Sequence, residues 1–205
     1  MASTAYSKLR QQAPRLALAL LFQTESQKQS LSALLLFGLE LDRIVAQASE
    51  PMLALIRLKW WEDQLDQPAD DAGPLAGYLH HHIKQGPLSQ DKVRALTGLW
   101  AASVQSGDTD LSENWAFLMA VMAEDAELQP SDIPGQIGRA VARSRAGKTV
   151  ESLSARDILR ACGPGCEFLI CLSYLAREAG RRDLNRAPLL IFALLYQVLF
   201  KPASR

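Results

Sequence analysis

The chain has 205 residues, of which 48% are hydrophobic, enough for a single domain with a sizeable core. Its 22 Lys and Arg residues balance its 22 Asp and Glu residues, so it lacks the basic excess typical of a nucleic-acid-binding protein, and we expect no nucleic-acid partner. An odd number of cysteines, Cys162, Cys166 and Cys171, argues against a secreted disulfide framework and favours buried thiols in a reducing compartment.

The even balance hides an asymmetry along the chain. Residues 1–136 hold 10 Lys or Arg and 17 Asp or Glu, a net charge of −7, whereas residues 137–205 hold 12 and 5, a net charge of +7. A basic final third suits an anionic partner, such as a diphosphate, an acidic protein or a membrane surface. The alternative is that the two parts complement each other within one fold.

Helices are predicted almost throughout, because Ala and Leu are abundant and no run alternates in β-branched residues. We expect a first helix over residues 7–23, where Pro14 either kinks the helix or marks its true start. A second is expected over residues 26–48. Ser49 can cap a third helix that starts at Pro51 and ends before a loop rich in Asp and Pro.

Further helices are expected after that loop, separated by turns that contain Gly, Pro or Asp. Their expected ranges are 74–85, 89–104, 111–127, 132–146, 154–161, 166–179 and 187–200. The fold class is therefore an all-α, single-domain helical bundle over residues 1–205. The apolar run at 187–200 is interrupted by Gln197 and falls short of the roughly 20 residues that cross a bilayer, so we expect a soluble or peripheral protein.

The histidine triplet at residues 80–82 invites a metal site. Consecutive helical residues point about 100° apart, so three neighbours do not converge easily on one ion. A helical face or a packed side chain is the favoured interpretation.

Residues 142–149, ARSRAGKT, partly match a phosphate-binding loop but lack its first glycine and a preceding strand. A nucleotide site is therefore rejected. Arg139 and Arg143 lie four residues apart on one helical face and remain candidates for binding an anion, with a solvated face as the simpler alternative.

Carboxylates four residues apart on a helix can hold Mg²⁺, and two such pairs occur, Glu62 with Asp66 and Asp66 with Asp70. Pro68 interrupts the second pair, and Lys59 faces the first, which indicates a partly neutralised surface. No GxSxG motif is present, and the histidines are not paired with a nucleophile, so nucleophilic catalysis is not expected.

Residues 34–66, LLLFGLELDRIVAQASEPMLALIRLKWWEDQLD, resemble the squalene/phytoene synthase family. The register of Glu50 and Pro51 with Arg57, Trp60 and Trp61 is most similar to a divergent branch that includes a mitochondrial assembly factor for respiratory complex I. The resemblance implies an isoprenoid-synthase type of helical bundle, shortened in its C-terminal half. It also implies cavity-lining or helix-packing roles for Phe37, Glu40, Arg57, Trp60 and Trp61.

Catalytic members of this family carry DxxxD motifs that hold Mg²⁺ against prenyl diphosphates. Transferred to this chain, the first motif falls on residues 42–46, where Asp42 is present but Ala46 replaces the second carboxylate, and no second DxxxD follows. One isolated carboxylate does not build the metal clamp that ionises a diphosphate. We therefore expect a degenerate, non-catalytic protein that needs no cofactor and acts by binding another protein or a membrane surface. Its expected location is cytoplasmic or peripheral on an inner (or mitochondrial inner) membrane.

Two alternatives stay open. One is a prenyl transferase that condenses prenyl diphosphates on an unorthodox Mg²⁺ site built from Asp42, Glu40 and either Glu124 or Asp125. The other is an isoprenoid or lipid carrier that keeps the cavity but not the chemistry. The two tryptophans bear on all three interpretations, because they point about 100° apart. One can pack in the core while the other meets a neighbouring helix, and Arg57 lies one turn from Trp61, close enough to stack on it.

Overall fold

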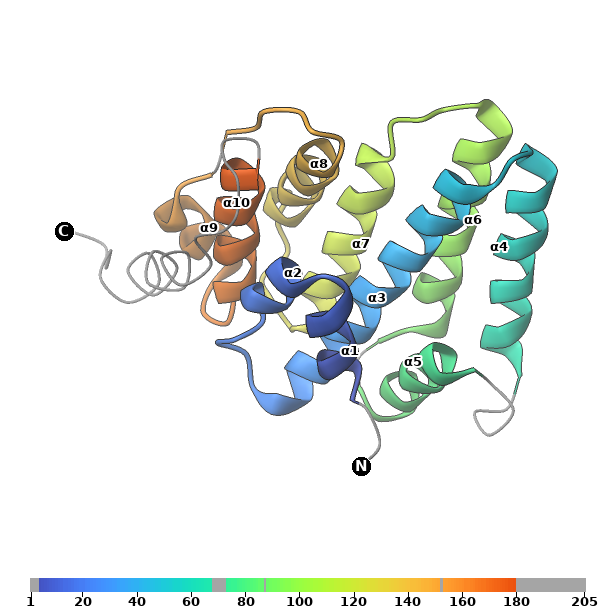
Figure 1. Ribbon diagram of the computed structural model, residues 1–205. Coiled ribbons are helices and arrows are strands. Elements are labelled where there is room, and N and C mark those ends of the chain that lie inside the picture. Colours follow the sequence, from blue (N-terminus) through green and yellow to red (C-terminus); the bar gives the residue numbers. More distant parts are fainter. Residues whose placement is uncertain (1–3, 68–72, 87, 152, 180–205) are drawn as a thin grey trace.

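A computed structural model of the chain describes residues 4–67, 73–86, 88–151 and 153–179. Over these residues the chain forms ten α-helices and no strand, so the all-α prediction is confirmed (Figure 1). The helix predicted over residues 187–200 lies outside the described residues. The helices are α1 (Ala5–Gln12), α2 (Pro14–Ala19), α3 (Glu25–Gln47), α4 (Pro51–Asp66), α5 (Pro74–Gln85), α6 (Gln90–Ser106), α7 (Ser112–Asp125), α8 (Ile133–Arg145), α9 (Ala155–Cys162) and α10 (Glu167–Ala179).

The N-terminal segment forms two short helices rather than one. Thr4 caps α1, since its hydroxyl oxygen accepts a hydrogen bond from the backbone N–H of Ser7 at 3.2 Å. Pro14 lacks an N–H and occupies the first position of α2, where no intrahelical donor is needed. Of the two outcomes considered for Pro14, the start of a new helix is the one observed.

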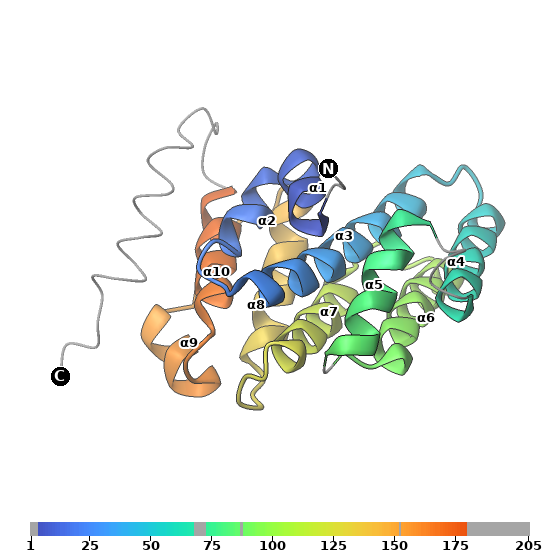
Figure 2. The same ribbon diagram turned by 90° about the horizontal axis from the view of Figure 1, so that it is seen from below.

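The central helix α3 carries the core. It is the longest helix of the described chain and contacts α1, α4, α5, α6 and α7 (Figures 1 and 2). Its apolar stripe is almost wholly removed from water, which supplies about 25 cal/mol of stabilisation for each Å² of apolar surface buried. The fully buried members are Leu31, Leu34, Leu35, Phe37 and Leu41.

The pair α7 and α8 makes the closest helix crossing. At the crossing, a Cβ atom added to Gly138 would lie 2.2 Å from the carbonyl oxygen of Trp115 and 2.6 Å from the Cα of Ala116. Only glycine lets the two backbones approach this closely. Arg145, at the C-terminal end of α8, reaches Asp42 in the C-terminal half of α3.

The three cysteines are buried and unpaired, as the sequence predicted. They lie on α9, on α10 and in the short turn between these helices, and they form part of the hydrophobic core. Burial raises the pKa of the Cys166 thiol to about 12, with smaller contributions from Cys162 and Glu167. Burial likewise raises the pKa of Cys171 to about 12. These thiols serve as small apolar side chains.

Candidate functional site: the Asp42 carboxylate

Asp42 lies in the C-terminal half of α3, on the face that meets α6, α7 and α8. Its side chain is only 14% exposed. A carboxylate removed from water needs hydrogen-bond donors or a cation to offset the loss of hydration. The surroundings of Asp42 supply both.

Three side chains from three different helices converge on this carboxylate. The indole Nε1 of Trp100 donates to Oδ1 at 3.0 Å, and the indole Nε1 of Trp115 donates to Oδ2 at 2.9 Å. The guanidinium of Arg145 also donates to Oδ2, at 3.2 Å, and forms an ion pair with the carboxylate. The same guanidinium lies over the Trp115 ring, 5.1 Å from its centroid, in a cation–π contact.

The electrostatics of the site follow from this packing. Burial raises the pKa of Asp42, while the charge of Arg145 and the hydrogen bonds from Trp100, Trp115 and Arg145 oppose the rise. Asp42 therefore joins α3 to α6, α7 and α8 through contacts on both of its oxygens.

This arrangement does not fit a Mg²⁺ ion. Mg²⁺ takes oxygen ligands in an octahedral shell, and the side chains that face Asp42 are two indoles and a guanidinium, which offer N–H donors instead. Ala46, one turn further along α3, lines the same pocket and contributes only a methyl group. Across the described residues, no three His, Cys, Asp or Glu side chains are grouped as a metal site would require.

A pocket of about 340 Å³ opens beside Asp42. Arg143, Arg145 and Lys148 line it together with Asp42 and Asp110, so its rim is basic overall. A second pocket, of about 450 Å³, lies on the other side of Arg143 and is lined by Arg139 as well. Arg139 forms an ion pair with Glu113 at 3.1 Å, and Arg143 is exposed. The anion-binding role of these two arginines stays a prediction.

The acids considered for an unorthodox metal site do not meet at Asp42. Glu40 forms an ion pair with Arg43, one turn away on the surface of α3, at 2.5 Å. Glu124 forms an ion pair with Lys92 of α6. Asp125 is hydrogen-bonded to Ser30, which lies 12 residues before Asp42 on the same helix, or about 18 Å along its axis. The structure therefore corrects the hypothesis that these acids assemble with Asp42.

A pocket of about 720 Å³ lies at that distant end of α3. His81, His82, Glu25, Asp125 and Glu127 are among the side chains that line it, and apolar atoms make up the larger part of its surface. Burial raises the pKa of Asp125; its hydrogen bond with Ser30 opposes the rise, and the charge of Glu127 adds to it.

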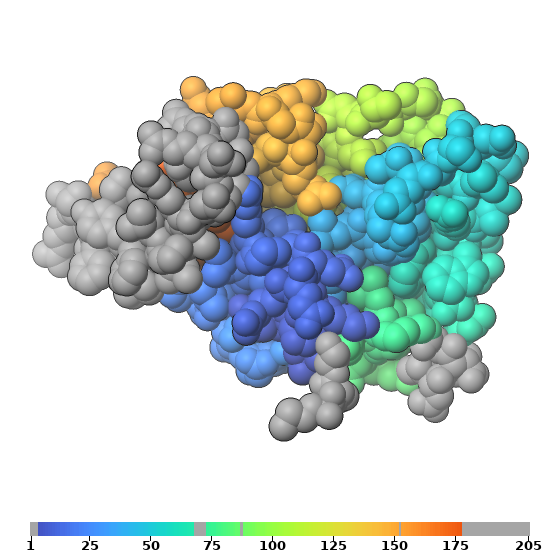
Figure 3. Space-filling model, viewed as in Figure 1, coloured from blue at the N-terminus to red at the C-terminus, as the bar shows by residue number. Residues whose placement is uncertain are grey.

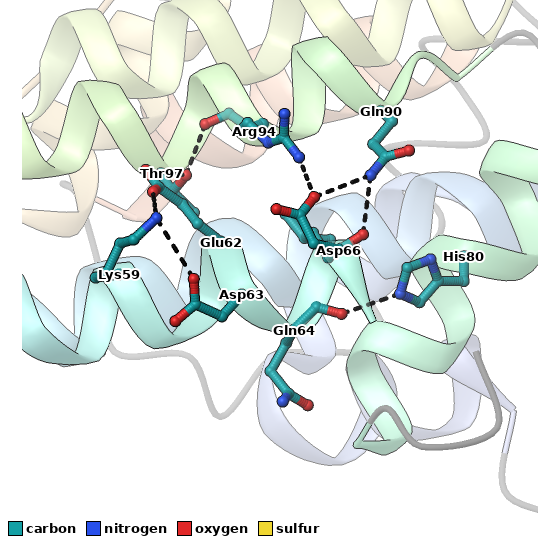
Figure 4. Close-up of polar contacts among 10 residues, drawn as sticks. Lys59, Glu62, Asp63, Gln64, Asp66, His80, Gln90, Arg94 and Thr97 are labelled. Carbon is teal, nitrogen blue, oxygen red and sulfur yellow. Dashed lines mark hydrogen bonds and ion pairs between the residues drawn. The ribbon is translucent and has the colours of Figure 1, made fainter. Parts of the chain in front are cut away.

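The acidic end of α4 is neutralised by its neighbours (Figure 4). Lys59 pairs with Glu62 at 2.9 Å and with Asp63 at 3.4 Å. Asp66 pairs with Arg94 of α6 and also accepts a hydrogen bond from Gln90 at 3.3 Å. The prediction of a partly neutralised surface is confirmed, and the pair at Glu62 and Asp66 does not form a metal site.

The three histidines of α5 make packing and hydrogen-bond contacts and do not form a metal-ligand group. His80 is buried, with Nε2 at 3.1 Å from the backbone carbonyl oxygen of Gln64, so it ties α5 to the end of α4 (Figure 4). The rings of His81 and His82 meet edge to face, with their centroids 5.2 Å apart. The three side chains do not converge on one point, as the helical geometry predicted.

The tryptophans of α4 divide between core and solvent. Trp61 is 6% exposed and packs edge to face on Phe37 of α3, with ring centroids 5.3 Å apart. Trp60 is 50% exposed and meets the Trp61 ring edge to face, with centroids 5.2 Å apart, so a contact between Trp60 and a neighbouring helix stays a prediction. Arg57 is exposed and, among the described residues, has no stacking or ion-pair partner, so it does not stack on Trp61.

The sequence alone did not point to the partners of Asp42. Trp100, Trp115 and Arg145 lie 58, 73 and 103 residues after it. Two isolated tryptophans on predicted helices are a weak signal of buried indoles that need an acceptor. Nothing in their spacing indicates that both use the same carboxylate.

Comparison with known proteins identifies the part of the chain that carries the resemblance. Residues 9–105, from α1 to α6, match the family model for squalene/phytoene synthase. Neither the curated proteins nor the solved structures yield a match. None of the helices in the described ranges combines the length and the apolar character that a membrane crossing requires. Residues 9–105, a little under half of the chain, are thus similar to the squalene/phytoene synthase family, and the described residues share its all-α character.

Proposed function

We propose that this chain is a non-catalytic member of its family that acts by binding. The observation that supports the proposal is the state of Asp42, whose two carboxylate oxygens accept three hydrogen bonds from Trp100, Trp115 and Arg145. A carboxylate that holds the Mg²⁺ needed to ionise a prenyl diphosphate has to offer oxygens to the metal and face other carboxylates. Here it faces donors and a cation.

The binding role takes the form of an assembly-factor-like or peripheral-membrane helper. The partner class is another protein or a membrane surface, and the setting is cytoplasmic or peripheral on an inner membrane. Charge supports an interaction role, since residues 137–205 carry a net charge of +7.

The test is product formation from farnesyl and geranylgeranyl diphosphate, with and without Mg²⁺, read by mass spectrometry. We expect no condensation product from folded protein under either condition. Magnesium-dependent condensation that is lost in Asp42→Asn would overturn the proposal and establish a prenyl transferase.

A binding measurement on the same protein sample distinguishes the proposed role from that of an isoprenoid carrier. Magnesium-independent, saturable binding of a prenyl alcohol would favour a carrier. We expect no such binding, because the proposal places the function on an interaction surface and not in a ligand cavity.

A further inference from the structure

The outer face of α4 carries an unusual concentration of exposed apolar side chains. Of the seven large hydrophobic residues that are exposed among the described residues, four lie on this one helix. Isolated exposed apolar residues are normal, whereas a contiguous group marks an interaction surface. The four are Met52 (63% exposed), Leu53 (42%), Ile56 (58%) and Trp60 (50%).

Their spacing puts them in one stripe. Met52, Ile56 and Trp60 are each four residues apart, so they follow one another along a single helical face over about 12 Å. Helix α4 lies at the edge of the bundle, where it packs mainly on α6 and less on α3 and α5 (Figures 1 and 2). Figure 3 shows its outer surface at the right-hand end of the molecule.

We infer that this face of α4 is a docking surface for a partner protein, which receives Met52, Ile56 and Trp60 in an apolar groove and places a carboxylate against Arg57. The inference deepens the binding role proposed above and takes that role as its premise. A protruding helix with anchors at intervals of four residues is the form that proteins recognise by helix-in-groove docking.

Charge identifies the chemistry of the groove. Lys59, on one side of the stripe, already has Glu62 and Asp63 as partners. Arg57, on the other side, is exposed and has no ion-pair partner within the described ranges. A groove that buries Ile56 and Trp60 would also dehydrate the edge where Arg57 lies, and a carboxylate of the partner would offset that cost.

A second copy of the chain fits this surface poorly. An antiparallel two-fold pairing about Ile56 brings both Arg57 side chains to the same edge, offset by about 3 Å along the axis. A parallel two-fold pairing sets Asp63 against Asp63. Both pairings place like charges together.

A membrane surface is also disfavoured. Helix α4 contains two cations and three carboxylates, Glu62, Asp63 and Asp66, for a net charge of −1. An anionic lipid surface attracts clusters of Lys and Arg and would repel this helix. A protein groove can match Arg57 and avoid the acidic end.

A photo-crosslinking amino acid at position 56 of the full-length chain, in cells of the source organism, tests the inference. The matched control places it at position 159, because Leu159 and Arg160 form a second exposed apolar–arginine pair, on α9. We expect one discrete adduct from position 56 that position 159 does not give, identified from the crosslinked peptide. The affinity of the chain for the purified partner should then fall about tenfold or more in each of the variants Ile56→Glu, Trp60→Glu and Arg57→Glu. The control variants Leu159→Glu and Arg160→Glu should bind the partner as tightly as wild type.

A charge swap completes the test: reversing the partner carboxylate nearest to Arg57 should restore binding to Arg57→Glu. Four results would overturn the inference. These are no adduct from position 56, a partner that binds Ile56→Glu as tightly as wild type, adducts only between copies of the chain, and Ile56-dependent binding to phosphatidylcholine–phosphatidylglycerol vesicles with no protein adduct. None of these readouts depends on catalytic turnover, so the two proposals can fail separately. If the chain is an active enzyme but still gives the adduct, only the proposed function is refuted. If the chain is inactive and gives no adduct, only the docking surface is refuted.

Discussion

The indole Nε1 of Trp115 lies 2.9 Å from Oδ2 of Asp42, and this hydrogen bond ties α7 to α3 inside the bundle. Together with Trp100 and Arg145, it places a donor on each oxygen of the one aspartate that the family resemblance marks as catalytic. Through these contacts the carboxylate connects α3 with α6, α7 and α8. A structural role for Asp42 can be tested, because replacing a structural carboxylate lowers the free energy of unfolding.

Replacing Asp42 should destabilise the fold strongly. In Asp42→Ala two indole N–H groups and the Arg145 guanidinium lose their acceptor, and we expect the free energy of unfolding to fall by about 3 kcal/mol. Asp42→Asn keeps one oxygen but turns an amide N–H₂ toward donors, which should cost about 1–2 kcal/mol. Urea denaturation followed by tryptophan fluorescence measures both. Asp63→Ala, an exposed control, should change stability by less than about 0.5 kcal/mol; an equally small effect of Asp42→Ala would contradict the structural role.

The crossing of α7 and α8 should not tolerate a methyl group. Gly138→Ala would force the new Cβ against the Trp115 carbonyl, so the helices must separate, at a cost of about 1–3 kcal/mol. Gly98→Ala on α6 is the matched control, since its Cβ meets nothing within 4 Å and alanine favours helix by about 1 kcal/mol. Thermal unfolding should therefore show opposite shifts in Tm for the two variants. Shifts of the same sign and size would refute the close approach at Gly138.

Asp125 should make stability depend on pH in a definite direction. Its folded-state pKa is raised above the ordinary 3.8, mainly by burial, so the folded state binds the proton more tightly than the unfolded chain. The contribution of this carboxyl to stability is therefore fully present below pH 3.8 and is lost as pH rises through the folded-state pKa. In urea titrations between pH 7 and pH 4, wild type should gain stability relative to Asp125→Asn as the pH falls. A constant difference between the two proteins would show that burial does not perturb this carboxyl.

The cysteines should be chemically silent in the folded protein. A thiol with a pKa of about 12 is almost entirely protonated at pH 8, and the thiolate is the reactive form. Iodoacetamide at pH 8 should therefore leave Cys166 and Cys171 unmodified in native protein and label them fully in urea, as read by mass spectrometry. Rapid labelling of the native protein would mean that α9 and α10 open readily.

Local chemistry in the sequence predicted the helices well. Pro51 and Pro74 each occupy the first position of a helix, and the observed ranges of α4 and α5 follow from them. Capping by Thr24 and Ser154 fixes two further starts through side-chain acceptance of a backbone N–H. These signals act over three or four residues, so they are legible without tertiary structure.

The candidate site was less accessible to prediction, because it depends on which faces meet. The resemblance marked Asp42, but its role follows from Trp100, Trp115 and Arg145, which reach it through packing of α6, α7 and α8. The same limit applies to the tryptophan pair on α4. Helical geometry predicts that Trp60 and Trp61 diverge, but not that Trp60 remains half exposed.

The distribution of Asp42's partners along the chain also governs when the bundle can close during synthesis. The span that matches the family ends at residue 105, before Trp115 and Arg145 have been made. A nascent chain that has emerged only to α6 holds a carboxylate with one indole and no cation, and it must keep that group hydrated. Because Arg145 lies 103 residues after Asp42, we expect this contact to form late, after α8 has left the ribosome.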